Sequence, residues 1–387
     1  MASLALEFET WLAARGYRPG GLAGQRGLVG HLNRWLAARE LRITDLSPSV
    51  LETFLETRRA EGYASKLTAR GLMPLLAFLA ERGLYTAPTP PMTDLDGLIG
   101  RFGRHLRDER GLGEGTAAGY ERVARQFLSV VDASTPSGVA GLTAGDVTAF
   151  VLVRSEELSV AGMQTMTGGL KALLRFLFAT GFTERDLVSA VPTAARRRPD
   201  LPRALPGSHV ERLLDSCDRT KPVGLRDFAV LTTLARLGLR ANEVAGLRLD
   251  DIDWSAGEIR IRGKGPRTDR LPLPATVGEP IADYLLHARP RCHDRRVFLR
   301  SCAPWQGLTR QAIGGLVRAA SRRAGLDPHG PHRLRHTVAT DLVRRGAPLI
   351  EIAQLLRHQN VQTTAIYAKV DLDALSALVQ PWPEARA

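Results

Sequence analysis

The sequence predicts a mainly α-helical protein with a small antiparallel β-sheet in its C-terminal part. Two observations carry this prediction. Apolar residues recur at helical spacing through the first half of the chain and again near its end, and Ser or Thr residues stand where such helices would begin. One stretch, Glu258–Arg262, instead alternates apolar with charged residues, which is typical of a strand.

The length of 387 residues suits two or three domains of about 100 to 200 residues each. No apolar run approaches the ~20 residues of a membrane span, and the N-terminus lacks the basic start of a signal peptide. We therefore expect no membrane association and a cytoplasmic location. The three cysteines, Cys217, Cys292 and Cys302, lack the spacing of a zinc site or a disulfide framework, so we interpret them as reduced.

Two successive stretches, 1–85 and 93–190, resemble each other in their apolar pattern. Corresponding positions are Phe8 and Phe102, Leu12 and Leu106, Phe54 and Phe150, and Phe78 and Phe176. Each stretch ends its last helical pattern at a Gly, which is typical of a helix C-terminus. Each therefore predicts a four-helix bundle, and the pair predicts a tandem duplication. The alternative, that any two amphipathic helical segments look alike, stays open.

Proline-rich segments separate these stretches from each other and from the rest of the chain. Thr86-Ala-Pro-Thr-Pro-Pro-Met92 predicts a first linker. A second, 191–206, combines Pro residues with four Arg residues. Because the residue before a Pro avoids the helical region, we expect this second linker to be extended.

The last part, 207–387, predicts a mixed α and β domain. A hairpin is expected where the strand pattern at Glu258–Arg262 is followed by the turn Gly263-Lys-Gly-Pro266 and a returning strand near Arg270-Leu-Pro-Leu273. Helices are expected at about 208–217, 225–237, 241–246, 279–288, 309–324, 332–345, 348–357 and 361–369.

A formal net charge of +13 and a pI near 10.4 are carried mostly by Arg. The planar guanidinium binds phosphate oxygens with two parallel hydrogen bonds, so nucleic acid is the first partner to consider. Charge alone leaves open a basic surface that is merely solvated. Four Arg residues in the second linker would suit a tether that lies along a DNA backbone.

Polar and ionisable residues of the last domain form an ordered set. Arg240 follows a Gly-broken helix end in Gly238-Leu-Arg-Ala-Asn-Glu243. His332 and Arg335 are three residues apart, so they project from one face of a helix. Leu355-Leu-Arg-His358 and Thr364-Ala-Ile-Tyr367 complete the set. His332 and His336 at i and i+4 could also be metal ligands, but no third ligand stands close by in the sequence.

The order Arg, hairpin Lys, His-x-x-Arg, His and Tyr resembles the catalytic set of the tyrosine recombinases, the phage integrase family. The resemblance covers roughly 208–375, and the stretch at 94–190 is similar to the helical core-binding domain that precedes it in the family. The family pattern falls on Arg240, Lys264, His332, Arg335, His358 and Tyr367. One departure is visible, because Arg357 stands where the family usually has Gly.

The resemblance implies a role for each of these residues. Tyr367 would attack a DNA phosphate and form a covalent 3′-phosphotyrosine, with His332 as the general base. Arg240 and Arg335 would stabilise the charge on the phosphate oxygens without a metal. Lys264 would protonate the departing 5′-oxygen, and His358 would donate a hydrogen bond to the phosphate. Because the covalent link conserves the energy of the broken bond, we expect no ATP, metal or other cofactor.

The resemblance also implies a domain layout and partners. Residues 93–190 would be the core-binding domain, 191–206 a linker and 207–387 the catalytic domain. The duplication makes 1–85 an additional bundle, whose basic residues favour contact with flanking DNA over contact with a neighbouring subunit or support of the fold alone. The expected partner is double-stranded DNA, bound by a homo-tetramer or a hetero-tetramer with related recombinases. Two alternatives remain, a type IB topoisomerase-like strand transferase and a catalytically inactive DNA-binding regulator.

Overall fold

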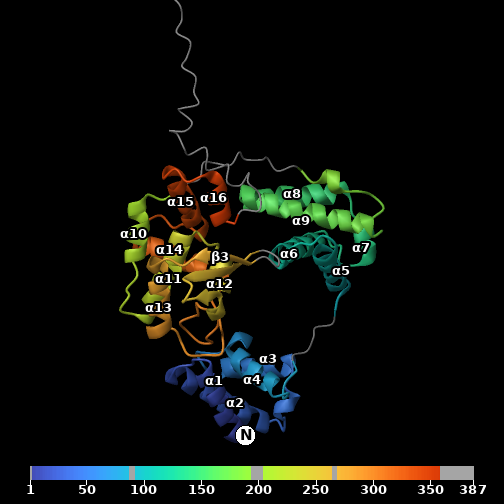
Figure 1. The fold of residues 1–387 in the computed structure, drawn as a ribbon. Helices are drawn as coiled ribbons and strands as arrows, with labels where there is room; N and C mark the ends of the chain where they lie inside the picture. Colours follow the sequence, from blue (N-terminus) through green and yellow to red (C-terminus); the bar gives the residue numbers. More distant parts are fainter. Residues whose placement is uncertain (1, 87–91, 193–203, 264–267, 358–387) are drawn as a thin grey trace, which may run out of the picture. The chain divides into compact units, whose positions relative to one another are not determined.

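A computed structural model describes residues 2–86, 92–192, 204–263 and 268–357 of the chain (Figure 1). It confirms the predicted class, because the described residues are mainly helical and include one three-stranded antiparallel sheet. The chain divides into two compact units, Pro88–Arg198 and a second unit that comprises Met1–Ala87 and Pro199–Ala387. None of the helices in the described ranges is both long and apolar enough to cross a membrane.

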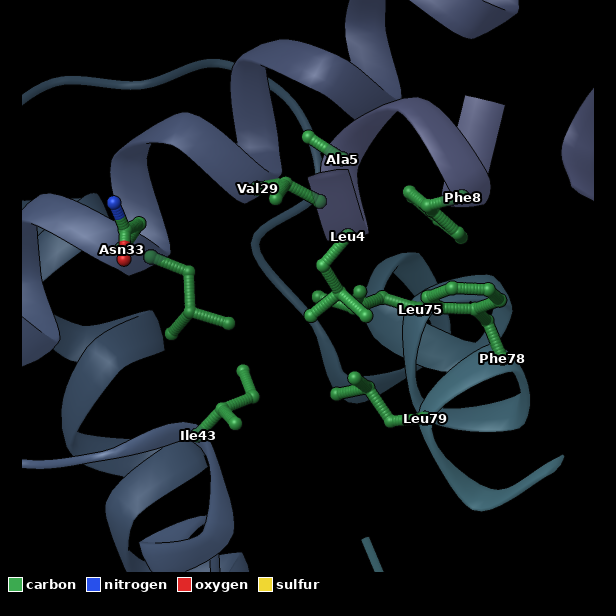
Figure 2. Close-up of a pocket in the computed structure, with 10 residues that line it drawn as sticks. Leu4, Ala5, Phe8, Val29, Asn33, Ile43, Leu75, Phe78 and Leu79 are labelled. Carbon is green, nitrogen blue, oxygen red and sulfur yellow. The ribbon is translucent and has the colours of Figure 1, made fainter. Parts of the chain in front are cut away.

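Residues 2–86 form the first predicted bundle. Its helices are α1 (Ala2–Ala14), α2 (Pro19–Ala37), α3 (Pro48–Ala60) and α4 (Ala69–Glu81), and they enclose their own hydrophobic core. Ser47 caps α3 by accepting a hydrogen bond from the Val50 amide, with Pro48 at the first helical position. A small cavity in this core is lined by apolar side chains and Asn33 (Figure 2). Among the described residues that line the cavity, none is ionisable.

Residues 92–192 form the second bundle, with a core of its own. Its helices are α5 (Asp94–Arg104), α6 (Glu114–Val130), α7 (Pro136–Ala140), α8 (Ala144–Glu157) and α9 (Val160–Ala179). The sequence predicted four of these and missed α7. Five residues are too few to show an apolar period, but the Thr135 cap and Pro136 at the first helical position suffice to start a turn of helix.

Equivalent aromatic pairs occupy the same two places in both bundles. The first and last long helices meet at Phe8–Phe78 in one bundle and at Phe102–Phe176 in the other, with ring centroids 5.1 Å and 5.4 Å apart. The two middle helices meet edge-on at Trp35–Phe54 and at Phe127–Phe150, with centroids 5.5 Å and 5.2 Å apart. These matched contacts support the proposal that the bundles arose by tandem duplication.

Residues 204–357 contain the predicted mixture of helices and sheet. The helices are α10 (Gly207–Asp215), α11 (Pro222–Leu237), α12 (Ala241–Gly246), α13 (Ala275–His287), α14 (Arg310–Arg323), α15 (Pro331–Arg344) and α16 (Leu349–Leu355). Strands β1 (Ile252–Asp253), β2 (Glu258–Arg262) and β3 (Thr268–Pro272) pair in that order, all antiparallel. In the register, Ile259 faces Leu271, and both are buried against the helices.

Some predicted boundaries were wrong. Helix α13 begins at Ala275 instead of near 279, and Pro280 lies inside it because buried Val277, Ile281 and Tyr284 hold this face of the helix in the core. Strand β1 was missed because two residues carry no alternation. Residues 264–266 of the predicted turn 263–266, and the predicted helix at 361–369, lie outside the described residues.

Candidate active site

The end of α11 places Arg240. The helix stops at Leu237, and Gly238 adopts a left-handed conformation with φ of +60°. A side chain there would be strained by this φ, and its Cβ would lie only 2.9 Å from the Leu356 side chain, so the position requires Gly. The chain then turns, and Arg240 becomes the N-cap residue of α12.

Glu243 holds Arg240 in place. Its Oε2 accepts the backbone N–H of Arg240 at 2.7 Å, which caps the start of α12, and its Oε1 accepts Nη1 of the Arg240 side chain at 2.9 Å. The Glu243 side chain is only 6% exposed, whereas that of Arg240 is 44% exposed. The Arg240 guanidinium is therefore anchored on one side and open to an incoming anion on the other.

Arg335 lies in α15 and is one of the largest fully buried side chains, with 1% exposure. Its Nη1 donates to the Gly238 carbonyl at 2.7 Å, and its Nη2 donates to the Leu356 carbonyl. These bonds join the end of α11 to the end of α16. The sequence predicted Arg335 as a phosphate ligand only, and the structure adds this structural role.

His332 lies in the first turn of α15, after Pro331. Burial lowers the pKa of His332 below its ordinary value. The positive charges of Arg335, Arg240 and Arg310 lower this pKa further. His332 is therefore neutral at pH 7 and able to accept a proton, as a general base must.

Three of the six predicted site residues are thus placed by the structure, and they come together. Arg335 donates to the carbonyl of Leu356 and Arg240 to the next carbonyl, that of Arg357, so both side chains reach the end of α16. His332 lies one turn before Arg335 on α15. Lys264, His358 and Tyr367 lie outside the described residues. Strands β2 and β3 flank the segment with Lys264, and α16 ends three residues before His358. Their predicted roles stay predictions.

The sequence interpretation gave no role to Arg357, which the structure places beside Arg240. Its side chain is 7% exposed, and its Nη2 donates to Glu243 Oε2 at 2.6 Å. Burial lowers the pKa of Arg357, but a guanidinium stays charged at any physiological pH. The only signal in the sequence was that Arg357 departs from the family Gly, and its partner could not be read there.

The stability of the fold is expected to depend on pH through two histidines of α15, His332 and His336. Burial is the main reason that the pKa of His336 is lowered to about 4, and the charge of His332 adds to it, with ring centroids 4.3 Å apart. The unfolded chain binds these protons near pH 6.5, so we expect the free energy of unfolding to fall between pH 6.5 and about 4. Thermal unfolding followed against pH measures this loss.

Carboxylates act in a different pH window. Ion pairs lower the pKa of Asp218 and Asp294 to about 2, so their contribution is lost only as the pH falls below the ordinary value of 3.8. The variant His336→Gln should flatten the loss between pH 6.5 and 4, and His293→Gln, at an exposed site, serves as the control. An equally steep loss in His336→Gln would contradict the assignment.

Comparison with known proteins shows the family of this chain. The sequence profile of the phage integrase family matches residues 203–373. The "Putative integrase/recombinase y4rA" of Sinorhizobium fredii is 40% identical over 390 aligned residues, which cover 99% of this chain and 95% of that protein. The tyrosine recombinase XerD of Listeria innocua is 33% identical, with 71% of this chain and 95% of that protein covered.

Solved structures share the fold. The XerH site-specific recombinase in a post-cleavage complex with a palindromic difH substrate has a TM-score of 0.57 at 19% identity, covering 86% of this chain and 95% of that one. A lambda integrase dimer bound to a core site has a TM-score of 0.54 at 15% identity, covering 69% and 96%. These structures show the shared fold, and the relatives show the class, that of integrases and recombinases. The chain belongs to the tyrosine recombinase (phage integrase) family.

Proposed function

We propose that this protein is a site-specific recombinase that cleaves and rejoins double-stranded DNA through a covalent bond between Tyr367 and a 3′-phosphate. The observation that supports the proposal is that Arg240 and Arg335 both donate to carbonyls at the end of α16, with His332 one turn before Arg335, in a chain of this family. Within the same proposal, 93–190 binds the core DNA site, 207–387 carries the chemistry, and the protein acts in the cytoplasm in integration, excision or transposition.

The chemistry follows from the charges. The Tyr367 oxygen attacks phosphorus and gives its proton to neutral His332. As the new P–O bond forms, the bond to the 5′-oxygen breaks, and Lys264 supplies the proton that this oxygen needs as a leaving group. Arg240 and Arg335 offset the charge that builds on the non-bridging oxygens. His358 donates a further hydrogen bond to the phosphate. Reversal of the same steps by the 5′-hydroxyl of a second strand rejoins the DNA.

Trapping of the covalent intermediate tests the proposal. A duplex taken from the DNA that flanks the gene is nicked beside the cleavage point, so that the released fragment diffuses away and religation fails. We expect a protein–DNA adduct that survives denaturing electrophoresis. A DNA-binding regulator on this scaffold would shift the duplex in a native gel without an adduct. A topoisomerase-like enzyme would relax supercoiled plasmid without exchanging strands between two duplexes.

Cleavage should continue in excess EDTA, because the two Arg side chains supply the positive charge that a metal would otherwise supply. The measurement is the yield of covalent adduct with and without chelator, using DNA binding as the control for integrity. Loss of the adduct on chelation, with recovery on addition of a divalent cation, would point instead to a metal bound by His332 and His336.

Assembly is proposed to involve the segment Asp371-Leu-Asp-Ala-Leu-Ser-Ala-Leu-Val379, which lies outside the described residues. Leu372, Leu375 and Leu378 recur at helical spacing, and we infer that they dock on a neighbouring protomer to link four subunits on DNA. Deletion from 371 onward should leave single-protomer DNA binding intact and abolish recombination. Unchanged recombination would exclude the idea, and a lowered unfolding midpoint would mean that the segment folds onto its own core.

A further inference from the structure

We propose that Arg357 is a positioning residue of the active site. It neutralises Glu243 and thereby leaves the charge of Arg240 available to the DNA phosphate. This inference rests on the proposed function, and it concerns a residue that the family pattern does not supply.

The end of α16 meets α12 and β3 at Arg357. Its Nη2 contacts Glu243 of α12 at 2.6 Å, and its Nε lies 3.9 Å from Asp269 Oδ2 of β3. Its backbone carbonyl accepts Nη2 of Arg240 at 3.4 Å. In the chain, Arg357 directly precedes His358, and β3 directly follows the segment with Lys264. Arg357 therefore contacts the elements that lie next to Arg240 and Lys264 in the chain, and it is itself the neighbour of His358.

The charges explain why a second Arg is useful here. Glu243 is buried at 6% exposure and forms ion pairs with both Arg240 and Arg357. Two guanidinium groups share the Glu243 carboxylate, so Arg240 does not have to neutralise it alone. The second carboxylate near Arg357, Asp269, is 44% exposed and 3.9 Å away, so solvent screens its charge. Without Arg357, Arg240 and Glu243 would form a neutral pair, and a buried carboxylate would compete with the phosphate for the same guanidinium.

The backbone conformation of Arg357 is unfavourable for a residue with a side chain. Its φ of +53° lies in the left-handed region, where Gly is favoured and a side chain is not. Gly at this position would therefore relieve the backbone while removing both ion pairs. The contacts to Glu243 and Asp269 are what favour Arg in this conformation.

The first experiment compares cleavage rates on the nicked duplex. We expect Arg357→Gly to lower the first-order rate at saturating DNA by about 10- to 100-fold, because the buried Glu243 carboxylate then competes with the phosphate for the Arg240 guanidinium, with little change in the DNA concentration for half-maximal rate. Arg357→Lys should recover part of the rate by restoring the charge. Adding Glu243→Gln to Arg357→Gly should also recover part of it, since no buried carboxylate then holds Arg240. Arg345→Gly removes an equal charge at a 74% exposed site and should cleave normally.

The second experiment needs no activity. The coupling between Arg240→Ala and Glu243→Gln is measured as the non-additivity of their shifts in unfolding midpoint, in the native chain and in the Arg357→Gly background. We expect this coupling to grow when Arg357 is absent. Unchanged coupling, or a doubly substituted Arg357→Gly/Glu243→Gln chain that cleaves no faster than Arg357→Gly, would overturn the inference. Larger coupling in a chain that forms no adduct with any duplex would keep the positioning role and reject the recombinase function.

Discussion

We expect Tyr367→Phe to form no covalent adduct with DNA and to bind the same duplex with unchanged affinity. The substitution removes one oxygen, the proposed nucleophile, and keeps the aromatic ring for packing. Denaturing electrophoresis of the trapped complex detects the adduct, and a native gel shift measures binding. Because no other group in the proposed mechanism can attack phosphorus, the loss should be complete and not graded.

A matched substitution controls for the chemistry of tyrosine in general. Tyr63→Phe removes a hydroxyl from a residue that is 40% exposed in the first bundle, and this variant should form the adduct as the native chain does. An adduct in Tyr367→Phe would show that another residue is the nucleophile. Peptide mapping of that adduct would then identify the residue.

The second large effect is expected for Arg240→Ala and Arg335→Ala, which should differ in their effect on stability. Arg240→Ala should lose at least about 2.7 kcal/mol of transition-state stabilisation, or roughly a hundredfold in rate. Its unfolding midpoint should change little, because the Arg240 side chain is 44% exposed. Arg335→Ala should lose a similar rate factor and also destabilise the fold.

Burial is the reason for that difference. Arg335 is 1% exposed and donates to the carbonyls of Gly238 and Leu356, so its removal leaves a cavity and two buried acceptors without this donor. We expect a cost of about 3 kcal/mol or more in the free energy of unfolding. Chemical denaturation of both variants measures it. Equal unfolding midpoints for Arg335→Ala and the native chain would contradict the structural role.

Local patterns predicted most of the secondary structure. The starts of α3 and α8 could be read from Ser47 and Thr143, which cap those helices as their sequence context predicts. The hairpin followed from alternation in Glu258–Arg262, and its partner strand pairs in the expected antiparallel sense. Boundaries failed where burial outweighed local preference, as at Pro280 inside α13.

The candidate site divides in the same way. The sequence by itself was enough to predict the fold class, the family and the six candidate residues, because residue type and spacing can be read without a structure. Only the tertiary structure decided that Arg335 is buried and that Arg357 shares Glu243 with Arg240. Those contacts join residues 97 positions apart for Arg335 and Gly238, and 114 apart for Arg357 and Glu243. Packing of α11, α12, α15 and α16 creates them, and no local pattern along the chain records which distant carboxylate a buried guanidinium will meet.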